Sequence, residues 1–216
     1  MPSEMPSAAH AGRTRAAELA ARWVLSGRRL EMQGIADELG ISRVTLFRHV
    51  GSREELLSEA LWLITEQTQR RAVRRWEARR PAGALRCVGV GREMNAMVAQ
   101  SAALHQLLAD EPPLAIRVLT DPLGKVQRGV VAFVESLLRH DIQEHGLRLL
   151  IPPDQLAFAI VRLGESFVYA DVLANRTPDV DTANRLQQAL IESAHVISFD
   201  PANAFATALA DRSTQQ

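Results

Sequence analysis

Glycines and prolines divide this chain into segments whose apolar residues recur at the spacing of a helix. Gly27, Gly40 and Gly51 each follow such a segment, and Gly40 in particular suits a left-handed C-cap. Sustained apolar–polar alternation and Asn-Gly or Asp-Gly hairpin turns do not occur, so the sequence carries no signal for β-strands. The sequence therefore predicts an all-α fold.

Capping residues set the bounds of several expected helices. Ser42 stands as an N-cap before the third one, and Ser52 with Glu55 three residues later has the spacing of a capping box at the start of the fourth. Prolines interrupt the second half of the chain repeatedly. Helices are expected over about residues 14–26, 31–39, 43–50, 52–79, 83–100, 102–109, 113–119, 123–144, 154–175 and 181–198, with disordered tails at residues 1–11 and 201–216.

The composition is that of a globular protein with a buried core. Apolar residues make up 47% of the 216 residues and charged residues 23%. The single cysteine, Cys87, excludes an intrachain disulfide, and no secretory apolar region follows Met1. No apolar run is long enough to span a membrane. These features predict a cytoplasmic protein without a membrane partner.

The formal net charge of zero conceals an uneven distribution along the chain. Residues 1–80 carry 14 arginines against 10 acidic residues, whereas residues 81–216 carry 11 basic residues against 15 acidic ones. A basic N-terminal third on a neutral protein indicates contact with a polyanion. The arginine-rich stretch at residues 70–80 is open to two interpretations, a cover for a hinge between domains or a solvated face.

Residues 31–50 have the pattern of two short helices joined by a tight turn at residues 40–42. Apolar residues of both helices, among them Ile35 and Leu46, can form a small shared core, and the small side chain of Ala36 lets the helices approach. The second helix presents polar and short side chains on its other face. A helix that reads the major groove of DNA needs such a face.

The same segment resembles the DNA-binding domain of the TetR family of transcriptional repressors. The resemblance covers about residues 12–60 and is strongest in the run IADELGISRVTLFRHVGSREELL from Ile35 to Leu57. It implies a helix-turn-helix DNA-binding domain at residues 12–60 and a helical ligand-binding and dimerisation domain at residues 61–200. The alternative is a helical hairpin within an all-α protein that does not contact DNA.

The resemblance also implies which side chains meet a double-stranded DNA operator. Arg43 and Val44 would face the major groove, and Arg53 at the start of the fourth helix would meet a phosphate. Phe47 stands where the family usually has tyrosine, so it lacks the hydroxyl that would donate to a phosphate. The implied DNA-contacting residues are Thr14, Gln33, Ser42, Arg43, Val44, Thr45, Phe47, Arg48, His49 and Arg53.

The expected helices over residues 154–175 and 181–198 are the candidate interface of a homodimer. The first is apolar on nearly all sides, as expected of a helix buried against its own domain and against a partner, and Gly164 allows close approach. A homodimer must hold its two recognition helices about 34 Å apart to enter successive major grooves. The family resemblance implies a four-helix interface of this kind.

Sensing of a small molecule is implied mainly by the resemblance. Met94 and Met97 are flexible side chains suited to an adaptable pocket, although methionines at such positions are also ordinary core residues. A polar stripe on the first interface helix could place hydrogen-bonding groups in an apolar cavity; the alternative is an Arg162–Glu165 pair with Tyr169 in the core of the interface. The candidate ligand-binding residues are Met94, Met97, Leu104, Leu107, Ile116, Phe133, Leu137, Arg162, Glu165, Ser166 and Tyr169.

The motifs of the common enzyme classes are not found in the sequence. It contains no Gly-x-Ser-x-Gly, no glycine-rich phosphate loop and no His-Glu-x-x-His. His140, Asp141, Glu144 and His145 gather near a helix end and could hold a metal, but a solvated helix terminus has the same composition, and we predict neither a metal nor a cofactor. Cys87 lies in an apolar helical stripe and is expected to be a buried, inert thiol.

The predicted function is a ligand-responsive repressor that binds a palindromic operator as a homodimer and is released by a small apolar effector. The segment from Ser42 to His49 and the helical layout are similar to regulators of lactone quorum-signal breakdown, which implies a lactone or acyl compound as the effector. The alternative is a helical regulator or adaptor without a small-molecule response. Binding to DNA that weakens with salt separates a repressor from an adaptor.

Overall fold

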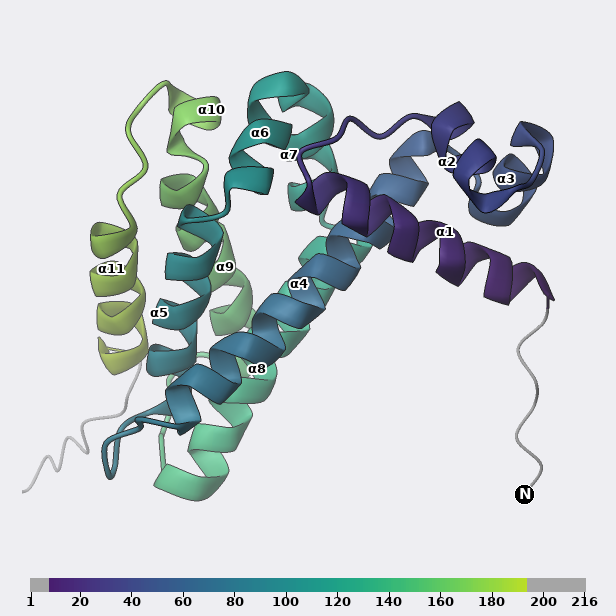
Figure 1. Ribbon diagram of the computed structural model, residues 1–216. Helices are drawn as coiled ribbons and strands as arrows, with labels where there is room; N and C mark the ends of the chain where they lie inside the picture. Colours follow the sequence, from purple (N-terminus) through teal and green to yellow (C-terminus); the bar gives the residue numbers. More distant parts are fainter. Residues whose placement is uncertain (1–7, 194–216) are drawn as a thin grey trace, which may run out of the picture.

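The computed structural model describes residues 8–193, and its regular elements in that range are helices (Figure 1). Eleven helices follow one another there, which confirms the predicted all-α fold. None of the helices in the described part is long and apolar enough to cross a membrane. The tail expected at residues 201–216 lies outside the described residues, as do residues 1–7 of the tail expected at the N-terminus.

Three helices and the first turns of a fourth form the N-terminal unit. α1 (Ala8–Leu25) packs along α4 (Arg53–Glu77), and α2 (Met32–Leu39) and α3 (Arg43–Val50) lie at the end of that pair (Figure 1). α1 begins six residues before the expected start at residue 14, so residues 8–11 belong to a helix and not to a tail. Three of these four residues are alanine, which has the highest helix propensity.

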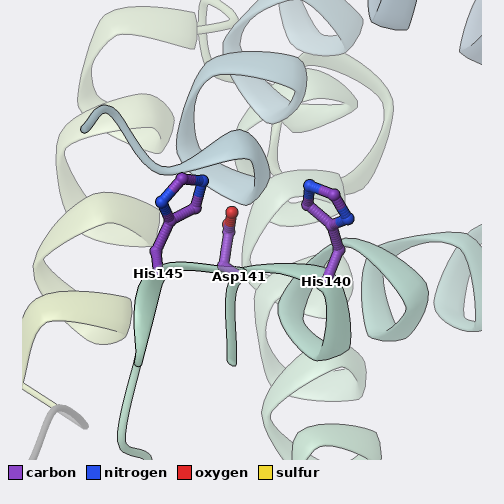
Figure 2. Close-up of side chains that lie close together, drawn as sticks. All are labelled: His140, Asp141 and His145. Carbon is purple, nitrogen blue, oxygen red and sulfur yellow. The ribbon is translucent and has the colours of Figure 1, made fainter. Parts of the chain in front are cut away.

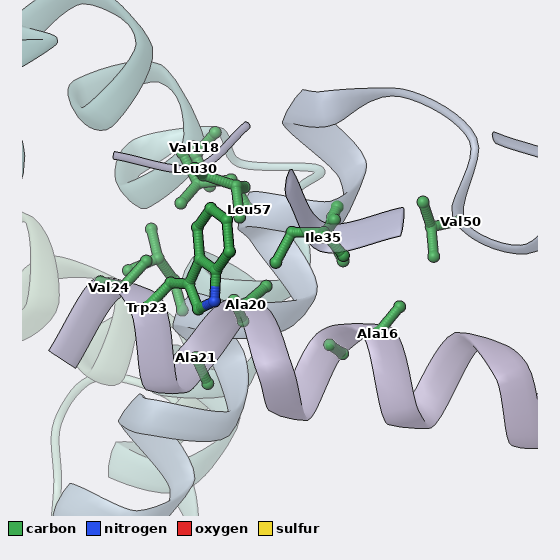
Figure 3. Packing of buried hydrophobic residues seen from close by; sticks show 14 of the residues in the cluster. Ala16, Ala20, Ala21, Trp23, Val24, Leu30, Ile35, Val50, Leu57 and Val118 are labelled. Carbon is green, nitrogen blue, oxygen red and sulfur yellow. The ribbon is translucent and has the colours of Figure 1, made fainter. Parts of the chain in front are cut away.

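Trp23 lies in the middle of the N-terminal core (Figure 3). Its ring packs on Gly34, where an added Cβ would come within 2.5 Å of the ring. The indole Nε1 donates to the Glu38 carboxylate at 3.0 Å, and the Arg28 guanidinium lies 3.6 Å from the ring centroid. The same apolar cluster reaches Val118, so the core is continuous from the N-terminal unit into the second half of the chain.

The long helix α4 joins the N-terminal unit to a C-terminal bundle. Two of its tryptophans pack on glycines of other helices, Trp62 on Gly129 and Trp76 on Gly89, where an added Cβ would lie 2.0 and 2.1 Å from the respective ring. Only glycine lets the helices meet at these contacts. The helices of the bundle are α5 (Arg86–Ala99), α6 (Ala102–Asp110), α7 (Pro112–Thr120), α8 (Lys125–His145), α9 (Pro153–Val168), α10 (Ala170–Ala174) and α11 (Val180–Ser193).

The single helix expected over residues 154–175 is two helices in the structure. α9 and α10 meet at Tyr169, whose φ of −104° and ψ of 24° depart from helical values. Hydrogen bonds of helical spacing continue on both sides, from the Tyr169 N–H to the Glu165 carbonyl and from the Leu173 N–H to the Tyr169 carbonyl. The interruption is therefore a one-residue bend at a buried side chain.

Gly164 provides a close approach, but within one chain. A Cβ added there would come within 2.6 Å of Nε2 of Gln187, so Gly164 lets α9 pack on α11. The prediction that Gly164 allows close approach is confirmed, and the neighbour that it approaches is α11 of the same chain. The helix expected over residues 181–198 is α11 as far as Ser193, and residues 194–198 lie outside the described residues.

Candidate DNA-binding surface and ligand cavity

Local hydrogen bonds shape the turn between α2 and α3. Gly40 ends α2 in the left-handed conformation, with φ of 67°. The Ser42 Oγ accepts from the Thr45 N–H at 3.0 Å and lies 2.8 Å from Thr45 Oγ1. At the start of α4 the Ser52 N–H donates to the Glu55 carboxylate and the Glu55 N–H donates to Ser52 Oγ. The predicted caps and capping box are confirmed, and each depends on residues close together in sequence.

α3 has one buried and one exposed face. Leu46 is fully buried in the core shared with α1, whereas Arg43 and Arg48 are exposed and 74% of Val44 is open to solvent. The Arg43 guanidinium lies 5.5 Å from the centroid of the Phe47 ring, which is itself partly exposed. An exposed helix face with guanidinium donors and an apolar side chain can bond guanine edges and contact thymine methyl groups.

The remaining polar residues implied by the resemblance lie in different surroundings. Thr14 on α1 and Gln33 on α2 are exposed, and each makes a hydrogen bond within its own helix. His49 packs against Gly12 of α1, where an added Cβ would lie 2.3 Å from the His49 Nδ1. That Nδ1 is buried and has no hydrogen-bond partner among the described residues. The expectation that His49 shares the outward face of Arg48 is therefore only partly met, because its ring supports the packing of α3 on α1.

Arg53 is partly buried at the start of α4. Its Nη1 and Nη2 donate to the two oxygens of the Glu111 carboxylate, at 2.8 and 2.5 Å, and its Nε donates to the Leu30 carbonyl at 2.6 Å. The hydrogen bond from Arg53 lowers the pKa of Glu111, so the pair is ionised at neutral pH. The expected contact of Arg53 with a DNA phosphate stays a prediction, and it would have to use the remaining N–H groups of Nη1 and Nη2, because protein oxygens already engage all three guanidinium nitrogens.

A partly open cavity lies in the C-terminal bundle between α4, α5, α7, α8, α9 and α11. We call it the inner cavity. Its volume is about 140 Å³, and aliphatic and aromatic side chains form most of its wall. Such a wall with a few polar groups is typical of a site for a small molecule. The candidate ligand-binding residues that line it are Met94, Phe133, Leu137, Glu165 and Tyr169.

Four other candidate ligand-binding residues lie outside the inner cavity. Met97 and Leu104 line a neighbouring groove between α4, α5 and α6. Leu107 lines a shallow hollow beside the end of α1, and Ile116 packs against the N-terminal core. Helical periodicity identified the inward faces of these helices but did not show which space each face meets.

The polar stripe of α9 divides between two environments. Arg162 and Ser166 are exposed, and the Ser166 hydroxyl donates to the Arg162 carbonyl. Glu165 and Tyr169 line the inner cavity. A nitrogen of Arg162 lies 2.8 Å from the Glu165 carboxylate, so the stripe contains both the ion pair and the cavity residues that the sequence offered as alternatives.

Glu165 is a carboxyl group in an apolar wall. Burial raises its pKa to about 7, against the opposing effects of Arg162 and of the Gln127 amide. Burial also raises the pKa of Tyr169, with a smaller contribution from the charge of Glu165, so the phenol stays protonated at neutral pH. At pH 7 the Glu165 carboxyl is therefore close to half ionised and can either donate or accept a hydrogen bond.

Several amide side chains of the cavity wall were missed by the sequence reasoning. Gln127 on α8 is 2% exposed; its amide lies close enough to the Glu165 carboxylate to lower the pKa of that group, but its Nε2 forms no hydrogen bond of good geometry with the described residues. Asn95 on α5 donates to Asn184 and Gln187 of α11, each at 2.8 Å. The available signal was a polar residue inside an otherwise apolar helical stripe. A buried donor without a partner is unusual, and a bound molecule with an acceptor would satisfy it.

His140, Asp141 and His145 lie near one another at the end of α8 (Figure 2), with possible ligand atoms within 4.8 Å, and Glu144 does not belong to the group. Both Asp141 oxygens are in use, since they accept the first two backbone N–H groups of α5 at 2.9 and 2.7 Å. Arg80 stands 3.8 Å from the same carboxylate and contacts His145. The positive charge of this guanidinium would repel a bound cation. We therefore interpret Asp141 as an N-cap of α5 that links α8 to α5.

Cys87 is a free, buried thiol, as the sequence predicts. Burial is the main reason why its pKa is raised, and the neighbouring Asp141 carboxylate raises it further. The thiol therefore stays protonated at neutral pH. It stands at the start of α5 and contributes to the wall of the inner cavity as a neutral, apolar side chain.

A capped helix-turn-helix with an exposed second helix, followed by a helical domain that encloses a cavity, is the architecture of a helix-turn-helix transcriptional regulator. Residues 82–192 match the family model of the tetracyclin repressor-like C-terminal domain, a match over more than half of the chain. The chain belongs to the TetR family. Since this family consists of transcriptional regulators, the chain is a DNA-binding regulator and not an enzyme.

One solved structure supports this assignment, and two others have a lower similarity. The chain is similar to the TetR-family transcriptional repressor QsdR of R. erythropolis, with 28% identity, a TM-score of 0.76, and coverage of 84% of this chain and 95% of that one. A protein of Rhodococcus sp. described as a TetR-family transcriptional regulator has 16% identity and a TM-score of 0.47 over 85% and 98% of the two chains. A gamma-butyrolactone receptor (ArpA like protein) has 17% identity and a TM-score of 0.40 over 86% and 98%. A search of curated protein sequences found no match.

Proposed function

We propose that the chain is a repressor that binds a palindromic operator as a homodimer and leaves it when a small, mainly apolar effector occupies the C-terminal domain. The observation that carries the proposal is the exposed face of α3, where Arg43, Val44 and Arg48 stand clear of the protein on a helix whose other face is buried. This arrangement supports direct reading of base edges in the major groove. The cytoplasm is the compartment we propose, and the free Cys87 is consistent with it.

Apolar side chains on the outside of α9 and α11 support a homodimer. Phe158 on α9 is 49% exposed and Leu186 on α11 is 42% exposed. Large apolar side chains that stay exposed on the outside of packed helices are typical of an interaction surface. Two copies packed about a two-fold axis on these helices would cover both residues and hold two copies of α3 for successive major grooves.

Contacts between α4 and the C-terminal helices support a coupling between the inner cavity and α3. Arg53 forms an ion pair with Glu111, which lies between α6 and α7. Glu54 pairs with Arg117 at 2.9 Å, and Glu59 pairs with Lys125 at 2.5 Å. α7 and α8 also contribute side chains to the cavity wall. A molecule that displaces these helices therefore moves the start of α4, which directly follows α3 in the chain.

The regulatory step in this proposal is a population shift. An effector must favour a conformer whose two recognition helices have the wrong spacing for the operator. A coupling free energy of about 3 kcal/mol lowers operator affinity roughly 150-fold, which is enough to release the DNA. The largely apolar wall with Gln127 and Glu165 supports an effector with a hydrocarbon part and a small polar group, and we propose an acyl compound or a lactone.

Selection of binding sites from a random DNA library, followed by native mass spectrometry of the complex, tests the proposal. We expect a two-fold symmetric consensus bound by two chains, and release of the DNA by an acyl or lactone compound. Phe158→Glu should weaken the dimer, because it places a charge in the interface, whereas Leu150→Glu changes an exposed leucine of the loop before α9 and should leave the dimer intact. An asymmetric consensus bound by a single chain would overturn the proposed homodimer.

A further inference from the structure

A second hollow, which we call the outer groove, adjoins the inner cavity. It lies between the end of α1 and helices α4, α5 and α6. Met94 belongs to the wall between the two spaces and is an unbranched, flexible side chain that changes conformation at low cost. A change in the conformation of Met94 would join the two spaces into one elongated site. The residues that line both are Thr65, Met94, Val98, Leu119 and Tyr169.

The sizes of the two spaces favour an elongated occupant. The inner cavity has a volume of about 140 Å³ and the outer groove about 330 Å³. Sites for small molecules usually measure roughly 300–1,000 Å³. The inner cavity is too small for such a molecule by itself. A chain-like molecule that crosses the Met94 partition makes use of both spaces.

Two arginines of α4, Arg71 and Arg75, stand one helical turn apart at the rim of the outer groove. Both are exposed, no acidic side chain lines the groove, and neither arginine has an ion-pair partner among the residues that the structure describes. By contrast, Arg79 and Arg80 of the same arginine-rich stretch pair with acidic residues of the bundle. Arg70 and Arg74 also have no ion-pair partner among the described residues, but they line a different hollow, which contains Glu66. Arg71 and Arg75 are therefore the arginines of this stretch that leave positive charge at the rim of the outer groove.

The inner cavity, unlike the rim of the outer groove, disfavours an anion. Glu165 lines the inner cavity, and Arg92 at its edge is engaged in a hydrogen bond with Gln188. An anion buried beside Glu165 would suffer both repulsion and loss of hydration. A hydrocarbon chain is accepted there, and an oxygen on the chain could accept a hydrogen bond from the unpartnered Nε2 of Gln127.

We propose that the inner cavity and the outer groove together bind one amphipathic anion, with its hydrocarbon chain in the inner cavity and its carboxylate or phosphate head group at Arg71 and Arg75. Guanidinium groups bind both kinds of head group by charge-assisted hydrogen bonds. This assignment rests on the proposed function, whose effector it specifies: among acyl and lactone compounds, it selects the charged acyl class over neutral lactones.

Calorimetric titration of the full chain with decanoate, decyl phosphate and decan-1-ol separates the contribution of the head group from that of the chain. We expect at least one of the two anions to bind about tenfold more tightly than the alcohol. The double variant Arg71→Gln/Arg75→Gln should remove this advantage and leave the affinity for decan-1-ol unchanged. The control variant Arg70→Gln/Arg74→Gln removes the same charge from a neighbouring face of α4 and should retain the preference.

A substitution in the inner cavity tests whether the hydrocarbon chain of the ligand lies there. Gly91 lines the inner cavity, and a Cβ added there would meet no atom within 4 Å. Gly91→Leu should therefore fill the cavity and weaken decanoate and decan-1-ol alike, whereas Gly91→Ala should have little effect. Equal binding of the alcohol and both anions, equal losses in the two arginine variants, or no binding of either anion overturns the proposal.

Release of operator DNA by the same compounds distinguishes this proposal from the proposed function. If decanoate binds in a manner that depends on Arg71 and Arg75 but leaves the operator bound, the site is correct and its role as the effector site is wrong. If neutral compounds release the operator while neither anion binds, the assignment of an amphipathic anion is wrong and the ligand-responsive repressor is supported.

Discussion

Replacement of Glu111 by glutamine should loosen the hold of the C-terminal domain on the start of α4. The wild-type carboxylate accepts from both terminal nitrogens of Arg53, at 2.8 and 2.5 Å, and a nitrogen of Arg29 lies 3.4 Å away. The neutral amide of glutamine has one oxygen and carries no charge, so it cannot form the bidentate ion pair in which each carboxylate oxygen accepts from one terminal nitrogen of Arg53. The side chains of Glu111 and Arg53 are 13% and 29% exposed, so water compensates only part of the loss.

The expected loss of stability lies between that of a surface ion pair and that of a buried one. Exposed pairs contribute up to about 1 kcal/mol and hydrogen bonds to charged groups about 1.5–3 kcal/mol, so we expect about 1–2 kcal/mol for Glu111→Gln. For a chain of this length that loss lowers the Tm by roughly 2–8 °C. The pKa of Glu111 is lowered on folding, so its stabilisation is present above the unfolded value of 4.5 and disappears as the pH falls through the folded value.

Thermal unfolding followed by circular dichroism at pH 7 and at acid pH measures both effects. The Tm of Glu111→Gln should lie below that of the wild type at pH 7, and the difference should shrink toward acid pH. Glu144→Gln, at an exposed position near the end of α8, is the matched control and should unfold like the wild type. Equal Tm values for Glu111→Gln and the wild type at pH 7, or a difference that does not shrink, would refute the reasoning.

Three further substitutions test the packing and the buried charges. Gly89→Ala brings a Cβ to about 2.1 Å from the rigid Trp76 ring and should cost about 1–3 kcal/mol in chemical denaturation, whereas Gly91→Ala two residues later should be neutral or stabilising. Asp141→Asn removes one of the two oxygens that accept the first backbone N–H groups of α5. The midpoint of its denaturation should therefore fall by the equivalent of about 1–3 kcal/mol, while the dependence of the unfolding free energy on denaturant concentration stays the same. Because burial raises the pKa of Glu165 to about 7, its carboxylate weakens the fold as the pH rises from 4.5 through that value. Glu165→Gln should therefore have a higher Tm than the wild type at pH 8 and a similar one at pH 4.5, and the reverse order at pH 8 would contradict the assignment.

The N-terminal unit could be predicted from the sequence because its determinants are local. The Ser42 cap, the left-handed Gly40 and the Ser52–Glu55 capping box each connect residues no more than a few positions apart. The periodic apolar residues of these helices also face the core as expected. Patterns of this kind depend on the backbone geometry of one helix end and need no knowledge of distant neighbours.

The features that the sequence did not reveal depend on contacts between distant residues. Arg53 occupies the position of a phosphate-binding residue in the pattern, but its partner Glu111 is 58 positions away. In the sequence Asp141 has the neighbours of a metal ligand, but its carboxylate accepts hydrogen bonds from the start of α5, 54 and 55 positions away. The inner cavity is likewise built by side chains from six helices, and for Gln127 the pattern of its own helix could not show that it faces a cavity.

The central claim is that α3 reads DNA sequence, and the ratio of affinities for the selected operator and for a scrambled duplex tests it most directly. Fluorescence anisotropy at constant salt measures this ratio for the wild type, for Arg43→Ala and for Arg139→Ala, an exposed arginine of α8 that serves as the control. Loss of a base contact costs about 1–3 kcal/mol, so the ratio should fall about 5- to 150-fold for Arg43→Ala and stay unchanged for Arg139→Ala. An unchanged ratio for Arg43→Ala, or equal binding of the two duplexes by the wild type, would contradict the claim.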